Sequence, residues 1–137
     1  MIRDQKMWTW HVLAGVVILV FLGLHMLTMH MEGVVKVDGL NPASAAAEHQ
    51  GGPEVRPIDW PNVKARGVQT RYMLIYIVLL GAALFHGLYG AWNIFFELNP
   101  KAWLRKAVGV LIVLTGVGLF VYGAWAAVAA RAVARGM

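Results

Sequence analysis

The chain has 137 residues, of which 59% are hydrophobic and only 14% are charged, and its mean hydropathy is +0.61. Water-soluble domains of this size seldom have such a balance, so the composition indicates an integral membrane protein without a separate soluble domain. Cysteine is absent, which excludes disulfides, thiol catalysis and iron–sulfur ligation by this chain. The formal charge of +5 comes from Lys and Arg at the ends of apolar segments and in loops, which favours contacts with lipid headgroups or partner subunits and argues against nucleic acid as a partner.

Three stretches of the chain contain no Lys, Arg, Asp or Glu: residues 7–31, 72–96 and 107–130. A helix needs about 20 apolar residues to cross the hydrocarbon of a bilayer. The pattern therefore predicts an all-α integral membrane protein with a single domain and three transmembrane helices, which we place at about residues 7–32, 70–98 and 104–131.

The first predicted helix begins with Trp8 and Trp10 in the interfacial belt and carries His25 well inside its apolar run. The connection that follows, about residues 33–69, holds four of the five prolines, so we expect an extramembrane loop. Residues 63–70 at its end are a candidate early start of the second helix.

The second predicted helix carries His86 inside its apolar run, and Asn99-Pro100 ends it. A short basic link, residues 101–106, leads to the third helix. The N-terminal tail and this link hold five Lys or Arg within few residues, so the positive-inside rule predicts a cytoplasmic N-terminus. The third helix has no histidine, and its glycines allow close helix packing: Gly109, Gly116, Gly118 and Gly123.

The two histidines inside apolar runs are candidate ligands of b-type haem. Ionisable side chains at membrane depth are costly and usually functional, and neutral imidazole is a common ligand of haem iron. Counted from the predicted cytoplasmic ends of their helices, His25 lies about 27 Å deep and His86 about 15 Å deep. Two axial ligands of one iron must lie at nearly the same height. The spacing therefore predicts two haems in a hetero-oligomeric bundle, each completed by a ligand from another subunit.

Helical spacing adds further candidate contacts. Gly90 lies one turn after His86 on the same stripe, where a small residue leaves room for a flat macrocycle. His11 and His30, which we expect near the two membrane interfaces, are candidate haem or propionate contacts. His30 is about 140° round the helix from His25, so the two do not face one pocket squarely. The alternative is that the histidines only hydrogen-bond neighbouring helices.

These residues resemble the membrane-anchor subunits of succinate:quinone oxidoreductases, the succinate dehydrogenases and fumarate reductases. Ala14-Gly15, nine apolar or small residues and then His25-Met26 are similar to the histidine-bearing helices of the dihaem branch. The segment from His86 to Glu97 is similar to the H-x-x-x-G pattern of the family, which an acid follows. The chain looks like the second anchor of the split form, which has two three-helix anchors.

The resemblance implies an electron-carrying subunit of respiratory complex II in the plasma membrane of a prokaryote. His25 and His86 would each ligate a haem b shared with a second anchor subunit. Electrons would pass between an iron–sulfur subunit and membrane quinone, expected to be menaquinone, while a flavoprotein subunit interconverts succinate and fumarate.

Two positions depart from the family pattern, and other functions stay open. Leu84 stands where some menaquinone-linked members have a proton-conducting Glu, and Leu98 where ubiquinone-linked members have an aromatic hydroxyl. The resemblance therefore gives this chain neither that proton route nor a quinone-binding residue. The alternatives are a b-type cytochrome subunit of a formate, hydrogen or nitrate enzyme, and a haem-free structural or transport subunit.

Overall fold

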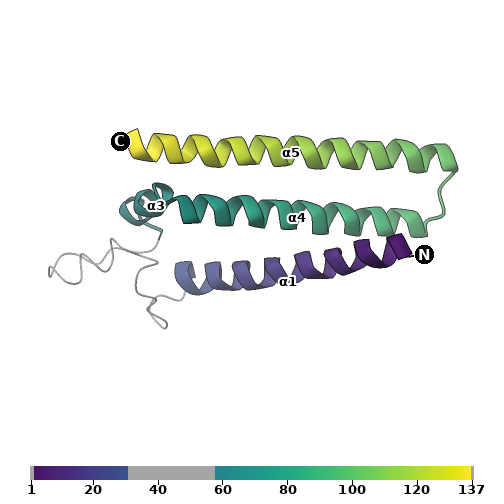
Figure 1. The fold of residues 1–137 in the computed structure, drawn as a ribbon, viewed down its shortest axis with the longest axis horizontal. Helices are drawn as coiled ribbons and strands as arrows, with labels where there is room; N and C mark the ends of the chain where they lie inside the picture. The colour runs from purple at the N-terminus through teal and green to yellow at the C-terminus, as the bar shows by residue number, and fades with distance from the viewer. Residues whose placement is uncertain (1, 31–57, 137) are drawn as a thin grey trace. The chain divides into compact units, whose positions relative to one another are not determined.

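The computed structural model describes residues 2–30 and 58–136, which form four α-helices (Figure 1). The predicted all-α class is confirmed, since these residues contain no strand. Residues 31–32 of the first predicted helix and 33–57 of the predicted loop lie outside the described residues. The helices are α1 (Ile2–His30), α3 (Trp60–Gly67), α4 (Thr70–Glu97) and α5 (Ala102–Gly136).

Three of the helices are long and apolar enough to cross a membrane. The apolar spans are Gln5–Leu27 in α1, all of α4 and all of α5, with mean hydropathies of 2.1, 1.9 and 2.2. A helix is suited to this setting because it satisfies its backbone hydrogen bonds internally. The chain is therefore a multi-pass membrane protein.

The helix bounds differ from the expected ones at three places. Helix α1 begins at Ile2, five residues before the expected start, because Gln5 and Lys6 continue the helix beyond its apolar run. Helix α5 continues to Gly136 rather than ending near residue 131. Residues 63–67 belong to the separate helix α3 and do not begin α4.

The described residues group into two compact units. Of the described residues, unit 1 consists of residues 2–19 and 77–126, and unit 2 consists of residues 20–30, 58–76 and 127–136. Unit 1 thus holds the first part of α1 with most of α4 and α5, and unit 2 holds α3 with the remaining ends of the long helices.

In unit 1, glycines bring α4 and α5 close together. Gly109, Gly116 and Gly123 are spaced seven residues apart, so they lie along one face of α5. A Cβ added at these positions would lie 3.3 Å from Trp92, 2.8 Å from Leu88 and 2.5 Å from Leu80, respectively. Large side chains of α4 therefore fill the space that the glycines leave, which is how membrane helices pack without a hydrophobic driving force between them.

The turn between α4 and α5 is held by one arginine. Asn99 has a φ of 48°, the left-handed conformation that Asn tolerates better than most residues, and Pro100 follows it. Arg105 in the first turn of α5 donates to Asn99 Oδ1 at 2.8 Å and to the carbonyl of Pro100 at 3.0 Å. Its guanidinium also lies 4.5 Å from the ring centre of Phe96. These contacts fix the antiparallel turn.

In unit 2, a polar cluster joins α3 to the ends of α4 and α5. Asn62 of α3 is fully buried and Arg66 is 5% exposed. Arg131 of α5 donates to the carbonyl of Val68 and to the hydroxyl of Thr70, which lie between α3 and α4 and at the start of α4. Charged hydrogen bonds of this kind are stronger than neutral ones, so Arg131 holds these segments together.

Most large apolar side chains of the long helices are exposed. Among the described residues only three hydrophobic side chains are buried, those of Ala14, Tyr72 and Ala134, whereas Trp8 and Leu19 are 61% and 73% exposed. A soluble domain would bury such side chains in a core. In a membrane protein, lipid and neighbouring subunits cover them.

The glycine face of α5 generates a stability prediction. Gly123→Val should lower the free energy of unfolding by about 1–3 kcal/mol, because the added side chain would overlap Leu80. Gly118→Val is the matched control on the same helix, since nothing lies within 4 Å of a Cβ there. Thermal unfolding of the purified protein in detergent measures the difference. Equal destabilisation by both changes would contradict this packing.

Candidate functional site

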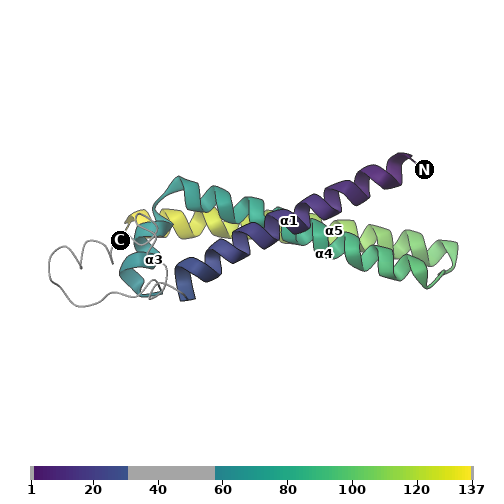
Figure 2. The ribbon, with the colours of Figure 1, turned by 90° about the horizontal axis from the view of Figure 1, so that it is seen from below.

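Two histidines from different helices meet face to face in unit 1. The rings of His11 on α1 and His86 on α4 have centroids 4.1 Å apart and planes only 2° from parallel. The ring of Tyr89, on the turn after His86, lies 5.2 Å from His11. Figure 2 shows α1 crossing α4, and this cluster joins the two helices within the unit.

A hydrogen bond to the backbone of α1 fixes the tautomer of the neutral His86 ring. Its Nδ1 lies 3.0 Å from the carbonyl oxygen of His11. A carbonyl only accepts, so Nδ1 carries the proton and donates it, and in the neutral ring Nε2 keeps a free lone pair. Among the described residues, Nε2 has no hydrogen-bond partner. Metal-binding histidines typically have this arrangement, with one nitrogen bound to a carbonyl and the other available to the metal.

Two glycines, Gly15 and Gly90, lie beside the stacked rings of His11 and His86. A Cβ at Gly15 would lie 3.0 Å from Cε1 of His86, so the absence of a side chain admits the ring to α1. At Gly90 an added Cβ would lie 3.5 Å from Cε1 of His11. The ring of His11 thus lies beside Gly90, the residue at which we expected room for a flat macrocycle.

The structure places His11 beside His86, a pairing that the sequence did not predict. Nδ1 of His11 is buried and has no hydrogen-bond partner among the described residues. A buried polar atom without a partner is costly and is typical of functional sites.

His25 and His30 belong to unit 2. Both are exposed on α1, and their rings approach edge to face, with centroids 6.4 Å apart and planes at 71°.

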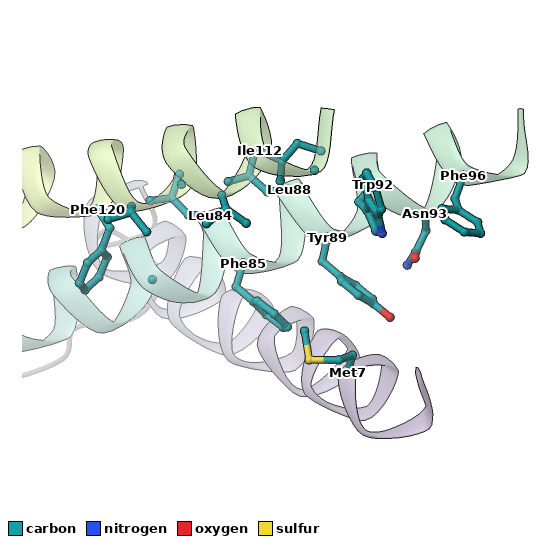
Figure 3. Close-up of a pocket in the computed structure, with 15 residues that line it drawn as sticks. Met7, Leu84, Phe85, Leu88, Tyr89, Trp92, Asn93, Phe96, Ile112 and Phe120 are labelled. Atoms are coloured by element: carbon teal, nitrogen blue, oxygen red, sulfur yellow. The ribbon is translucent and has the colours of Figure 1, made fainter. Parts of the chain in front are cut away.

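A cavity of about 990 Å³ lies in unit 1 along α4 and α5. Its wall is mostly apolar and aromatic, with Phe85, Trp92 and Phe96 among its residues, and none of the four histidines within the described residues lines it. Figure 3 shows Tyr89 directed toward the α1 side, where Met7 lies, with its hydroxyl outermost. Tyr89 and Asn93 supply polar groups to a mostly apolar cavity. Sites for apolar ligands typically have this arrangement.

The described residues hold no group of three or more His, Asp or Glu side chains that could bind a metal ion. The chain therefore offers single imidazole ligands and no complete protein ligand set in these residues. Haem needs only one or two axial ligands, because the porphyrin supplies the other nitrogens of the iron.

Sequence reasoning identified His86 but missed its partner. The signal was present in the spacing, because Gly15 lies four residues after His11, and in a helix the side chain at i+4 flanks the carbonyl at i. A glycine there opens that carbonyl to a donor from another helix. The donor comes from α4 because α1 packs against α4. The sequence pattern of α1 alone does not reveal which helix it packs against.

The stacked pair generates a second prediction. His11→Phe keeps an aromatic ring on His86 and removes the buried nitrogen, so the stability should be unchanged or higher. His11→Ala loses the stacking and should lower the free energy of unfolding by about 0.5–1.5 kcal/mol. Thermal unfolding of both variants provides the comparison. If His11→Phe proves less stable than His11→Ala, Nδ1 of His11 has a binding partner.

The stacked pair of His11 and His86 belongs to a chain with three membrane-spanning helices. Its function is inferred from its own residues, above all from the pair formed by His11 and His86. No protein-family model, curated protein or solved structure matches the chain.

Proposed function

We propose that this chain is a haem b-binding membrane-anchor subunit of a succinate dehydrogenase or fumarate reductase, located in the plasma membrane of a prokaryote. The observation that carries the proposal is the hydrogen bond from Nδ1 of His86 to the carbonyl of His11, which leaves Nε2 available as a metal ligand. The dicarboxylate part of the proposal rests on the resemblance of the segments around His25 and His86 to that family.

His86 is the proposed ligand of the haem nearer the cytoplasm. His11 cannot be its counterpart on the same iron while the rings are stacked, because opposite axial ligands point at each other through the metal and do not lie side by side. The second ligand is therefore assigned to the partner anchor subunit. When bound, haem accepts and passes on single electrons, and this chain supplies the nitrogen ligand, its fixed orientation and an apolar setting.

His25 is the proposed ligand of a second haem. The depths counted along the predicted helices, about 27 Å for His25 and about 15 Å for His86, support a separate level in the membrane. The side chain of His25 is exposed, as expected for a ligand whose cofactor is shared with another subunit. His30, whose ring touches that of His25, is the proposed contact for a propionate at the outer face.

The cavity along α4 and α5 is the proposed site for the quinone, for which menaquinone is expected. Its apolar wall suits the ring and isoprenoid tail of such a molecule, and the Asn93 amide and Tyr89 hydroxyl can donate hydrogen bonds to carbonyl oxygens. Phe85 and Tyr89, which line the cavity, flank His86 on α4. The cavity and the proposed iron ligand thus occupy the same part of the helix.

The cytoplasmic partners are an iron–sulfur subunit and a flavoprotein subunit. Lys101 and Lys106 are exposed beside the turn between α4 and α5, whereas Arg105 is engaged with that turn. We assign the two lysines to headgroup contacts and to docking of the iron–sulfur subunit, with the N-terminus on the same cytoplasmic side.

A second candidate function is a haem-free subunit whose histidines join helices. The contact between His11 and His86 favours it, because the hydrogen bond and the stacking already link α1 to α4 without a cofactor. A b-type cytochrome subunit of a formate, hydrogen or nitrate enzyme would share the haem chemistry, and co-purification of a flavoprotein with succinate activity distinguishes it.

Haem content tests the proposal. In the intact purified complex, His86→Ala should remove the inner haem and His25→Ala the outer one, so each should lower the haem-to-protein ratio by about half. His11→Phe is the matched control, since it keeps the carbonyl that holds His86. Pyridine haemochrome assay and reduced-minus-oxidised spectra measure the content. A colourless wild-type complex would favour the helix-joining function, and a haem content unchanged in both alanine variants would exclude these ligands.

Quinone kinetics test the cavity. Asn93→Leu should raise the KM for quinone by about threefold to tenfold, because one hydrogen bond to the ring is lost, while the haem spectrum stays unchanged. Ile94→Leu is the control, since the neighbouring Ile94 is exposed and does not line the cavity. Steady-state reduction of a soluble quinone analogue by the purified complex gives both values. Equal KM values for the two variants would place the quinone elsewhere.

A further inference from the structure

We infer that Gly15 is a positioning residue for His86: by having no side chain, it opens the helical carbonyl of His11 to the imidazole of another helix. The inference rests on the proposed function, in which His86 ligates haem iron. Gly15 does not itself touch iron, and it acts through the orientation of the ring.

Helix geometry explains why this position matters. In α1 the carbonyl of His11 points along the axis toward the amide of Gly15, so a side chain at residue 15 would stand beside that oxygen. The carbonyl has two lone pairs and can accept from the amide of Gly15 and from Nδ1 of His86 together. Glycine leaves this second approach open, whereas a Cβ at residue 15 would force the imidazole to shift.

The distances show how tightly the ring is seated. A Cβ built on Gly15 would lie 3.0 Å from Cε1, 3.2 Å from Nδ1 and 3.9 Å from Nε2 of His86. The added methyl would therefore press on the edge of the ring that makes the hydrogen bond and would leave the Nε2 side less crowded. It would push Nδ1 away from the carbonyl, 3.0 Å distant in the native contact.

Three contacts together restrict the ring of His86. The face of His11 covers one side of it, the carbonyl of His11 holds Nδ1, and the bare backbone of Gly15 bounds the Cε1 edge. Rotation of the ring would break the hydrogen bond or the stacking. A hydrogen bond from Nδ1 to a carbonyl also raises the basicity of Nε2 and so favours the oxidised form of a bound metal.

The other glycine within the span of α1 makes no such contact. Nothing lies within 4 Å of a Cβ built on Gly23, although glycine in a helix interior costs about 1 kcal/mol relative to alanine at either position. Gly15→Ala and Gly23→Ala therefore make the same chemical change in the same helix. Only the methyl group added at residue 15 would contact His86.

The experiment compares these two variants in the intact complex by electron paramagnetic resonance and redox titration. Gly15→Ala should retain both haems, shift the ferric low-spin signal of the His86 haem and raise its midpoint potential, because Nε2 becomes less basic when the hydrogen bond weakens. Gly23→Ala should match the wild type in both readouts. A Gly15→Ala complex with the wild-type signal and potential would overturn the inference and leave the proposed function standing.

A haem-independent measurement separates the two proposals and covers failed assembly of Gly15→Ala. In the full-length wild-type chain labelled with ¹⁵N-histidine, His86, identified by loss of its signal in His86→Gln, should show a protonated Nδ1 and an unprotonated Nε2. The reverse tautomer would overturn the inference whether or not haem is present. Absence of haem from the wild type would instead contradict the proposed function.

Discussion

The hydrogen bond from His86 to the backbone of α1 is the interaction on which the candidate site depends. In a bilayer, a helical carbonyl is normally satisfied by its own helix, and polar side chains have few partners. Here the carbonyl of His11 accepts a second donor from a residue 75 positions away. The same bond joins two helices and determines which nitrogen of His86 is available for chemistry. In the proposed function, the joining of two helices and the ligation of iron would coincide in this imidazole.

Glycine has a different consequence on each helix of unit 1. On α5 a seven-residue repeat of glycine receives leucine and tryptophan side chains of α4, which is a packing role. On α1, Gly15 receives the edge of a polar ring. Gly118 and Gly23 have open space at the Cβ position. The residue type alone does not indicate which role applies, and the neighbour that fills the space decides it.

The sequence was sufficient to predict the three long helices, because a run without charge and of spanning length has few other outcomes in water or in a bilayer. It also identified His86, since an ionisable residue at membrane depth is rare. It did not predict the pairing with His11, because the register of α1 against α4 is set by side-chain packing between the two helices, which the hydropathy pattern of α1 alone does not reveal.

The turn held by Arg105 has a consequence for the order in which unit 1 forms. Helices α4 and α5 are joined by residues 98–101, so their contacts close a short loop, whereas the contact between His86 and His11 must close one that spans most of the chain. The entropy of loop closure increases with length, and nearby segments therefore associate first. We therefore expect the α4–α5 hairpin to associate before the N-terminal helix docks onto it, so that the imidazole of His86 acquires its fixed tautomer at the later step.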